Sequence, residues 1–302
     1  MKQMRLHIYL ILGFFLLTFI LGSFFDLELS KAIFSSKNAF GLTISIIGTL
    51  LGYACLSLCG GGLLGLALHK AYPRKGKVFL YLFSGIAFVV SIYYAGREFF
   101  GPNGFTNEKL VWLGYLLALP FLVGAGYLGY LIAKRSDNKM LLNILIILLI
   151  AMFIALVPGV SLLKSIFHRP RYRTLSDPLY SEITFHNWYE RCSNYKELMS
   201  LYSLTSEEFK SFPSGHAGAA SVVTLTITFS PMFDSRIKKN HLIYFYFSFL
   251  FILLVSFSRI LVGAHFLSDV SMGALITTLV LLVTNEIVIK QSVKFEQTHQ
   301  KQ

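Results

Sequence analysis

Three short segments in the second half of the chain contain residue types suited to phosphate chemistry. They are Lys164–Arg171, Pro213–His216 and Ser258–Asp269. Each adjoins a long apolar run, where ionisable groups are costly unless they are used or paired. Phosphoryl transfer requires cations for the non-bridging oxygens, a nucleophile, an acid for the leaving group and a carboxylate that orients a histidine. The three segments together contain all of these groups.

The third segment places His265 four residues before Asp269. On a helix, residues at this spacing share one face. An aspartate that accepts a hydrogen bond from one imidazole nitrogen leaves the other nitrogen basic, as a nucleophile requires. A structural pair that caps a span explains the same spacing and, taken alone, is the more common arrangement. Ser258-Arg259 and Gly263 favour catalysis, because they predict a tight basic corner just before the histidine.

The second segment, Pro213-Ser-Gly-His216, is typical of a helix start. Free N–H groups and the helix dipole make such a start an anion site. We expect the Ser214 hydroxyl and the Gly215 N–H to hold a phosphate oxygen, with His216 beside them as proton donor. An ordinary helix cap with an interfacial histidine is the alternative interpretation.

The first segment is basic. Lys164 ends an apolar run, and Arg169, Arg171 and Arg173 follow it. Arginine offers phosphate oxygens a planar fork, and lysine offers them a point charge. A patch that holds anionic lipid is the alternative interpretation, and it is compatible with an anionic lipid as substrate.

The composition is that of a polytopic membrane protein. Of the 302 residues, 55% are hydrophobic and 14% are charged, whereas a soluble domain carries about a quarter charged residues. The net charge of +12 arises mostly in short connectors, so it does not indicate a nucleic-acid partner. Three cysteines are too few for a disulfide framework, and we expect Cys55 and Cys59 to be packing residues.

About eight apolar segments are long enough to cross a membrane, which requires roughly 20 residues. We expect spans near 6–25, 41–68, 78–96, 110–133, 140–163, 214–231, 242–262 and 266–289. The first has a basic start but lacks a small-x-small cleavage site, so we interpret it as an uncleaved anchor. The first four contain few ionisable groups and are expected to be scaffold.

Basic connectors predict the orientation of these spans. Lysines and arginines crowd the short loops near Arg74, Arg135 and Lys238, and Lys290 follows the last span. With eight spans, these clusters and the N-terminus fall on one side, which is then cytoplasmic. All three motif segments fall on the opposite, outer side.

Residues 172–212 form the one long extramembrane connector, and it is rich in aromatic residues. Leu204–Phe209 predicts a helix start with Thr205 or Ser206 as cap. We favour an interfacial helix with aromatics at headgroup depth over a lid that selects the lipid head group.

In order and spacing, the three segments resemble the motifs of the type 2 phosphatidic acid phosphatase (PAP2) superfamily: Lys-x6-Arg-Pro, Pro-Ser-Gly-His and Ser-Arg-x5-His-x3-Asp. The second and third motifs match in full. The first matches at Lys164 and Arg171, with Tyr172 in place of a proline that shapes the backbone and has no chemical role. Arg169-Pro170 is a poorer register, because it lies only five residues after Lys164. The resemblance covers residues 140–290.

The resemblance implies a role for each motif residue. His265 attacks phosphorus and forms a phosphohistidine, Asp269 orients it, and His216 protonates the leaving oxygen and then activates water. The residues that hold the phosphoryl oxygens are Lys164, Arg171, Ser214, Gly215 and Arg259. We expect neither a metal nor a cofactor, because cations take the place of Mg²⁺ and no carboxylate cluster accompanies the motifs.

The expected protein is therefore an all-α membrane bundle of about eight helices. Residues 1–139 form an N-terminal scaffold, residues 140–290 a PAP2-like catalytic domain that includes the loop 172–212, and residues 291–302 a cytoplasmic tail. The expected activity is metal-independent hydrolysis, at the outer face of the cell membrane, of a lipid phosphate or polyprenyl pyrophosphate. Phosphatidic acid, phosphatidylglycerol phosphate and undecaprenyl pyrophosphate are the candidate substrates. A lipid phosphotransferase and a non-enzymatic anionic-lipid binder or transporter are the alternatives.

Overall fold

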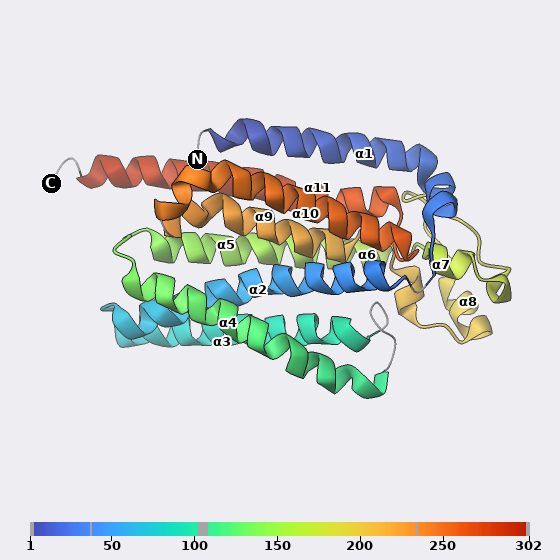
Figure 1. The fold of residues 1–302 in the computed structure, drawn as a ribbon, viewed down its shortest axis with the longest axis horizontal. Helices are drawn as coiled ribbons and strands as arrows, with labels where there is room; N and C mark the ends of the chain where they lie inside the picture. Colours follow the sequence, from blue (N-terminus) through green and yellow to red (C-terminus); the bar gives the residue numbers. More distant parts are fainter. Residues whose placement is uncertain (1–2, 37, 102–107, 234, 300–302) are drawn as a thin grey trace.

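Long helices that run side by side build the fold (Figure 1). The computed structural model describes residues 3–36, 38–101, 108–233 and 235–299, and these residues contain no β-strand. The N-terminal helices are α1 (Met4–Ile33), α2 (Ala39–His69), α3 (Arg74–Phe100) and α4 (Val111–Arg135). The C-terminal helices are α5 (Leu141–Leu156), α6 (Leu163–Phe167), α9 (Gly215–Phe233), α10 (His241–Leu261) and α11 (Leu267–His299), with a π-helical turn at Val157–Leu162 between α5 and α6. The prediction of an all-α membrane bundle is confirmed.

Seven helices of the described chain are long and apolar enough to cross a membrane. The remaining expected span, near 214–231, coincides with α9, which is not among the seven. Alanine, glycine, serine and threonine line α9, and it contacts α2, α5, α10 and α11. Helix α9 packs against protein on several sides. Small residues on such a helix allow its neighbours to approach closely, and large apolar side chains are needed less than on a helix that faces lipid.

The N-terminal helices do not form a single unit. Helices α2, α3 and α4 pack on one another, whereas α1 packs along α11 and also touches α10. Figure 1 shows α1 on the opposite side of the bundle from α3 and α4. Helix α11 continues through His299, so it includes most of the predicted tail; residues 300–302 lie outside the described residues.

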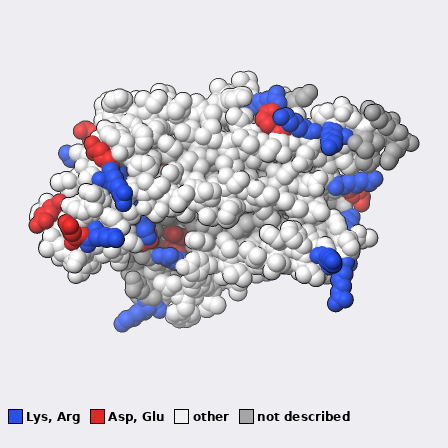
Figure 2. All heavy atoms as spheres, turned by 180° about the vertical axis from the view of Figure 1, so that it is seen from behind, with Lys and Arg blue, Asp and Glu red and all other residues white. Residues whose placement is uncertain are grey.

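The motif segments and the two ends of the chain lie at opposite ends of the bundle. In Figure 1, α6, α7 (Tyr172–Leu175) and α8 (Tyr195–Tyr202) lie at one end, and the Met4 end of α1 and the His299 end of α11 lie at the other. Figure 2 shows charged side chains gathered towards the two ends of one face, with a largely uncharged band between them. The motif segments therefore lie at the end that holds α6, α7 and α8. This agrees with the prediction that all three motifs fall on one side of the membrane spans.

The long connector folds around a small core of its own. Its buried residues are Ile183, Cys192, Leu198 and Phe209. The predicted helix at Leu204–Phe209 is a 3₁₀ turn over Ser206–Phe209, and the Thr205 side chain makes no capping hydrogen bond. The α-helix lies earlier, at Tyr195–Tyr202. The pattern therefore marks where a helical turn begins, but that turn is a single 3₁₀ turn without a side-chain cap.

Glycines set the close crossing of α2 and α4. A Cβ atom at Gly61 would overlap the backbone oxygen of Gly126, and one at Gly129 would overlap the backbone oxygen of Leu58. Small residues at such crossings let membrane helices approach and gain van der Waals contact. Gly124, on the same helix α4, has nothing within 4 Å of its Cβ position.

Replacing Gly61 should separate α2 from α4. Because the obstruction is backbone, it cannot rotate away, and we expect Gly61→Ala to destabilise the protein by about 1–3 kcal/mol. Gly124→Ala is the matched control and should leave stability unchanged or slightly raised. Thermal unfolding in detergent measures both variants, and equal midpoints for the two would contradict this account of the crossing.

Candidate active site

The three motif segments meet at one end of the bundle. The Ser214 N–H donates to the Asp269 backbone oxygen at 2.8 Å, and Arg171 Nη1 donates to the Ala264 oxygen at 3.1 Å. Gly263, with φ of +64°, reverses the chain between α10 and α11. A Cβ there would be strained and would lie 2.9 Å from the Arg173 nitrogen, so glycine suits this turn.

His265 is held by a backbone carbonyl rather than by Asp269. Its Nδ1 lies 2.6 Å from the Ser211 backbone oxygen and 3.8 Å from Asp269 Oδ2. A carbonyl only accepts, so Nδ1 carries the proton and Nε2 keeps its lone pair. The expected tautomer is therefore present, but its direct partner is Ser211.

Asp269 is linked to His265 through Ser211. Its Oδ2 accepts from the Ser211 hydroxyl at 2.5 Å and from the Phe266 N–H at 2.8 Å. The second bond is the reciprocal bond of a helix cap, in which the third helical residue of α11 binds the backbone N–H at the cap position. Asp269 thus fixes both Ser211, which orients His265, and the turn that carries His265.

The nucleophile candidate is buried among cations. His265 is 1% exposed. Burial, and next the positive charge of Lys164, lower the pKa of His265 well below its ordinary value, and Arg171 and Arg259 act in the same direction. A neutral imidazole at neutral pH is the form that can attack phosphorus.

The basic side chains are positioned by backbone oxygens. Lys164 Nζ donates to the Lys210 oxygen at 2.8 Å, and Arg171 Nε donates to the Glu207 oxygen at 2.7 Å. Arg171 and Arg259 are both almost completely buried. Lys164 and Arg171 are thus held by neutral carbonyls, with the Glu207 carboxylate 3.8 Å from Arg171 Nη2. An arriving anion would offset the cost of burying these cations.

The Pro213–His216 segment begins α9 as expected. Ser214 is fully buried, and its hydroxyl accepts from the Ala217 N–H at 3.4 Å. A Cβ at Gly215 would meet only Lys164 Cε at 3.7 Å and Val160 at 3.8 Å. Gly215 therefore brings the first turn of α9 beside the Lys164 side chain. The His216 and His265 rings lie with centroids 6.3 Å apart.

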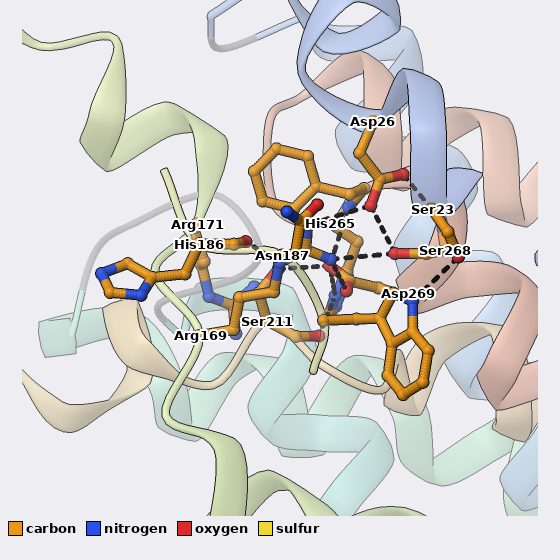
Figure 3. A network of polar contacts seen from close by, with 12 residues as sticks. Ser23, Asp26, Arg169, Arg171, His186, Asn187, Ser211, His265, Ser268 and Asp269 are labelled. Atoms are coloured by element: carbon orange, nitrogen blue, oxygen red, sulfur yellow. Dashed lines mark hydrogen bonds and ion pairs between the residues drawn. The ribbon is translucent and has the colours of Figure 1, made fainter. Parts of the chain in front are cut away.

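Arg169 has a structural task that the motif spacing did not reveal. It is 0% exposed and donates to Asp269 Oδ1 at 2.6 Å and to Asp26 Oδ2 at 2.9 Å, as Figure 3 shows. It also donates to Ser268 Oγ at 2.9 Å and lies 4.1 Å from the centre of the Phe266 ring. Arg169 thus joins two carboxylates, whereas Arg171 donates to the backbone oxygen of Ala264, next to His265.

Two carboxylates from the expected scaffold reach the motif residues. Asp26 on α1 accepts from the Ser268 N–H at 2.9 Å, and Glu98 Oε2 on α3 lies 3.0 Å from His216 Nε2. Sequence reasoning missed both. A usable signal existed, because an ionisable residue inside or beside an apolar run needs a partner.

The connector docks on this end of the bundle. Trp188 Nε1 donates to Ser23 Oγ on α1 at 2.8 Å, and its ring stacks on Phe212 with centroids 5.6 Å apart. Burial acts to raise the pKa of Glu208, but the hydrogen bond and charge of Arg173, with the charge of Arg171 and the hydrogen bond from Thr174, together lower the pKa to about 2. Glu208 therefore stays ionised and holds Arg173, and its backbone oxygen accepts from the Arg171 N–H of the first motif at 2.9 Å.

Removing the Asp26 carboxylate should destabilise the fold. Asp26→Ala leaves Arg169 with one carboxylate fewer in a fully buried place, and breaking such a pair costs about 3–5 kcal/mol. We expect a clear drop in the thermal midpoint in detergent. Glu28→Ala, an exposed position on the same helix, is the matched control. Similar midpoints for the two variants would show that Asp26 is dispensable.

Comparison with known proteins agrees with the motifs. The PAP2 superfamily model matches residues 140–292. This range contains all three motif segments and the connector, whereas Asp26 and Glu98 lie before it. Searches among curated proteins and among solved structures found no match. The matched range covers half of the chain, and the chain belongs to the PAP2 superfamily.

Proposed function

We propose that this protein is a metal-independent membrane phosphatase that hydrolyses a lipid phosphate or polyprenyl pyrophosphate through a phosphohistidine. Membership of the PAP2 superfamily indicates phosphatase or phosphotransferase activity on lipid phosphates. One observation carries the finer proposal: His265 donates from Nδ1 to a carbonyl, so Nε2 is left as a nucleophile among buried cations.

The reaction has two steps. His265 Nε2 bonds to phosphorus, the bond from phosphorus to the leaving oxygen breaks, and His216 gives that oxygen a proton. A water oxygen then bonds to phosphorus, the bond from phosphorus to nitrogen breaks, and His216 takes the proton from the water. Lys164, Arg171 and Arg259, with the Ser214 hydroxyl and the Gly215 N–H, stabilise the charge on the non-bridging oxygens.

The substrate class is amphiphilic. The described helices are long and apolar enough to lie in a membrane, and the candidate site lies where the motif segments meet at one end of the bundle. A phosphate head group can reach this end while its apolar tail stays in the bilayer. Phosphatidic acid, phosphatidylglycerol phosphate and undecaprenyl pyrophosphate all fit this description, and each supplies a dianionic or more highly charged group to the cations.

Phosphate release by the purified protein from these three lipids tests the proposal. We expect His265→Ala to abolish release while the protein remains folded in detergent, because the variant lacks the atom that bonds to phosphorus. Asp269→Asn should reduce turnover about a hundredfold or more, since it disturbs Ser211 and the imidazole that Ser211 orients. Vanadate should inhibit, and a chelator should have no effect.

Other outcomes separate the competing functions. Transfer of phosphate to an added alcohol in preference to water would identify a phosphotransferase. Lipid binding by wild-type protein without release of phosphate from any lipid would favour a binder or transporter. Normal release by His265→Ala would refute the proposed nucleophile, and loss of activity in chelator that Mg²⁺ restores would refute metal independence.

We also propose that the site faces the outside of the cell and that both termini are cytoplasmic, because the basic connectors lie at the end opposite the motifs. In a variant without Cys55, Cys59 and Cys192, a cysteine placed at Ser200 should react with an impermeant thiol reagent in intact cells. A cysteine at Ser136 should react only after the membrane is opened. The reverse pattern would invert the orientation.

A further inference from the structure

A carboxylate from outside the matched family region contacts the second catalytic histidine candidate. Glu98 Oε2, on α3, lies 3.0 Å from His216 Nε2. The Glu98 side chain is 19% exposed and the His216 side chain 7%. We propose that Glu98 is a positioning residue, which holds His216 in the tautomer and orientation needed for acid–base catalysis. This inference rests on the proposed function.

The contact decides which nitrogen of His216 faces the substrate. An ionised carboxylate only accepts hydrogen bonds, so the His216 Nε2 carries a proton directed at Glu98. The other nitrogen, Nδ1, is then the one that exchanges a proton with the leaving oxygen. A carboxylate partner also stabilises the imidazolium form, which is the form that an acid needs before the first step.

The proton balance is complete with this pair. His216 begins as imidazolium and gives its Nδ1 proton to the leaving oxygen as the bond from His265 to phosphorus forms. It is then neutral, with its remaining proton on Nε2 directed at Glu98. In the second step Nδ1 takes a proton from the attacking water, and the imidazolium is restored. Glu98 remains a carboxylate throughout.

Charged groups on several elements surround the pair. Arg171 and Arg259 interact electrostatically with Glu98, and Arg259 and Lys164 do so with His216. The titratable and charged groups that face the pair are Tyr53 on α2, Lys164 on α6, Arg171 before α7, Arg259 on α10 and His265 before α11. Arg259 and Lys164 oppose a positive charge on His216, whereas the Glu98 carboxylate favours it. The proposed imidazolium therefore depends on Glu98.

The packing of α3 fixes where Glu98 lies. Tyr94, one turn before Glu98, stacks on Tyr53 of α2 with the rings 5.3 Å apart and 8° from parallel. On the other side, a Cβ at Gly96 would lie 2.8 Å from Tyr115 Cα of α4. The end of α3 is thus held by α2 and α4. The N-terminal helices therefore place the Glu98 carboxylate beside His216.

Glu98→Gln tests the inference, because it removes the charge and keeps the shape. For a lipid phosphate whose leaving group is an alkoxide, we expect kcat to fall about tenfold or more with KM little changed. The loss should be smaller for nitrophenyl phosphate, whose leaving group needs no proton. The alkaline limb of the kcat profile should move to lower pH, because the acid loses its carboxylate partner. Glu28→Gln, at an exposed position on α1, is the matched control.

A double-mutant cycle asks whether Glu98 acts through His216. In a His216→Ala background, Glu98→Gln should cost little further activity. An equal cost with and without His216 would overturn the inference. So would an increase in kcat or a lower KM in Glu98→Gln, because that result would mean that Glu98 occupies the place of the phosphate.

A measurement without turnover separates this inference from the proposed function. In protein labelled with ¹⁵N at histidine, His216→Ala identifies the signals of His216 by their loss. We expect Nε2 to carry the proton in the neutral ring, and the titration midpoint of His216 to fall in Glu98→Gln but not in Glu28→Gln. If wild-type protein hydrolyses no lipid phosphate, the proposed function fails, and this titration still decides the role of Glu98.

Discussion

The structure of the site depends on the burial of one guanidinium group. Arg169 is 0% exposed and lies between the carboxylates of Asp26 and Asp269. A charge in such a place is stable only when its partners approach closely and fill its hydrogen bonds. Arg169 therefore holds α1, the connector and α11 together, through Asp26, the His186 backbone oxygen and Asp269. Asp269 in turn fixes Ser211, and Ser211 orients His265.

The same principle explains how several like charges can lie close together at the candidate site. Lys164 and Arg171 are satisfied by backbone oxygens, which are polar but uncharged. Glu207 adds a carboxylate beside Arg171, at 3.8 Å. Under the proposed function, a phosphate group would bring further negative charge to these cations, which the folded chain already holds close together.

The sequence identifies the motif segments, which the structure brings to one end of the bundle, but it does not identify their supporting partners. His265, His216, Lys164 and Arg171 stand in short patterns whose spacing is informative. By contrast, Asp26 lies 143 residues from Arg169, and Glu98 lies 118 residues from His216. Nothing in the local pattern of α1 or α3 identifies such a partner. A lone carboxylate beside an apolar run signals only that some partner exists.

Backbone partners are hidden from sequence reasoning in another way. The acceptor for His265 is the carbonyl of Ser211, and a backbone carbonyl is the same in every residue. The helical spacing of His265 and Asp269 favoured a direct bond, yet these atoms lie 3.8 Å apart. The spans were easier to predict, because the membrane imposes length and hydrophobicity on any helix that faces lipid.

Helix α9 has a consequence for how the protein is assembled. It carries His216 and lies against α2, α5, α10 and α11. Two of these neighbours precede it in the chain and two follow. In the order of synthesis, α2 and α5 are therefore made before α9, whereas α10 and α11 are made after it. The surroundings of His216 are complete only when the last two long helices of the chain have packed on α9.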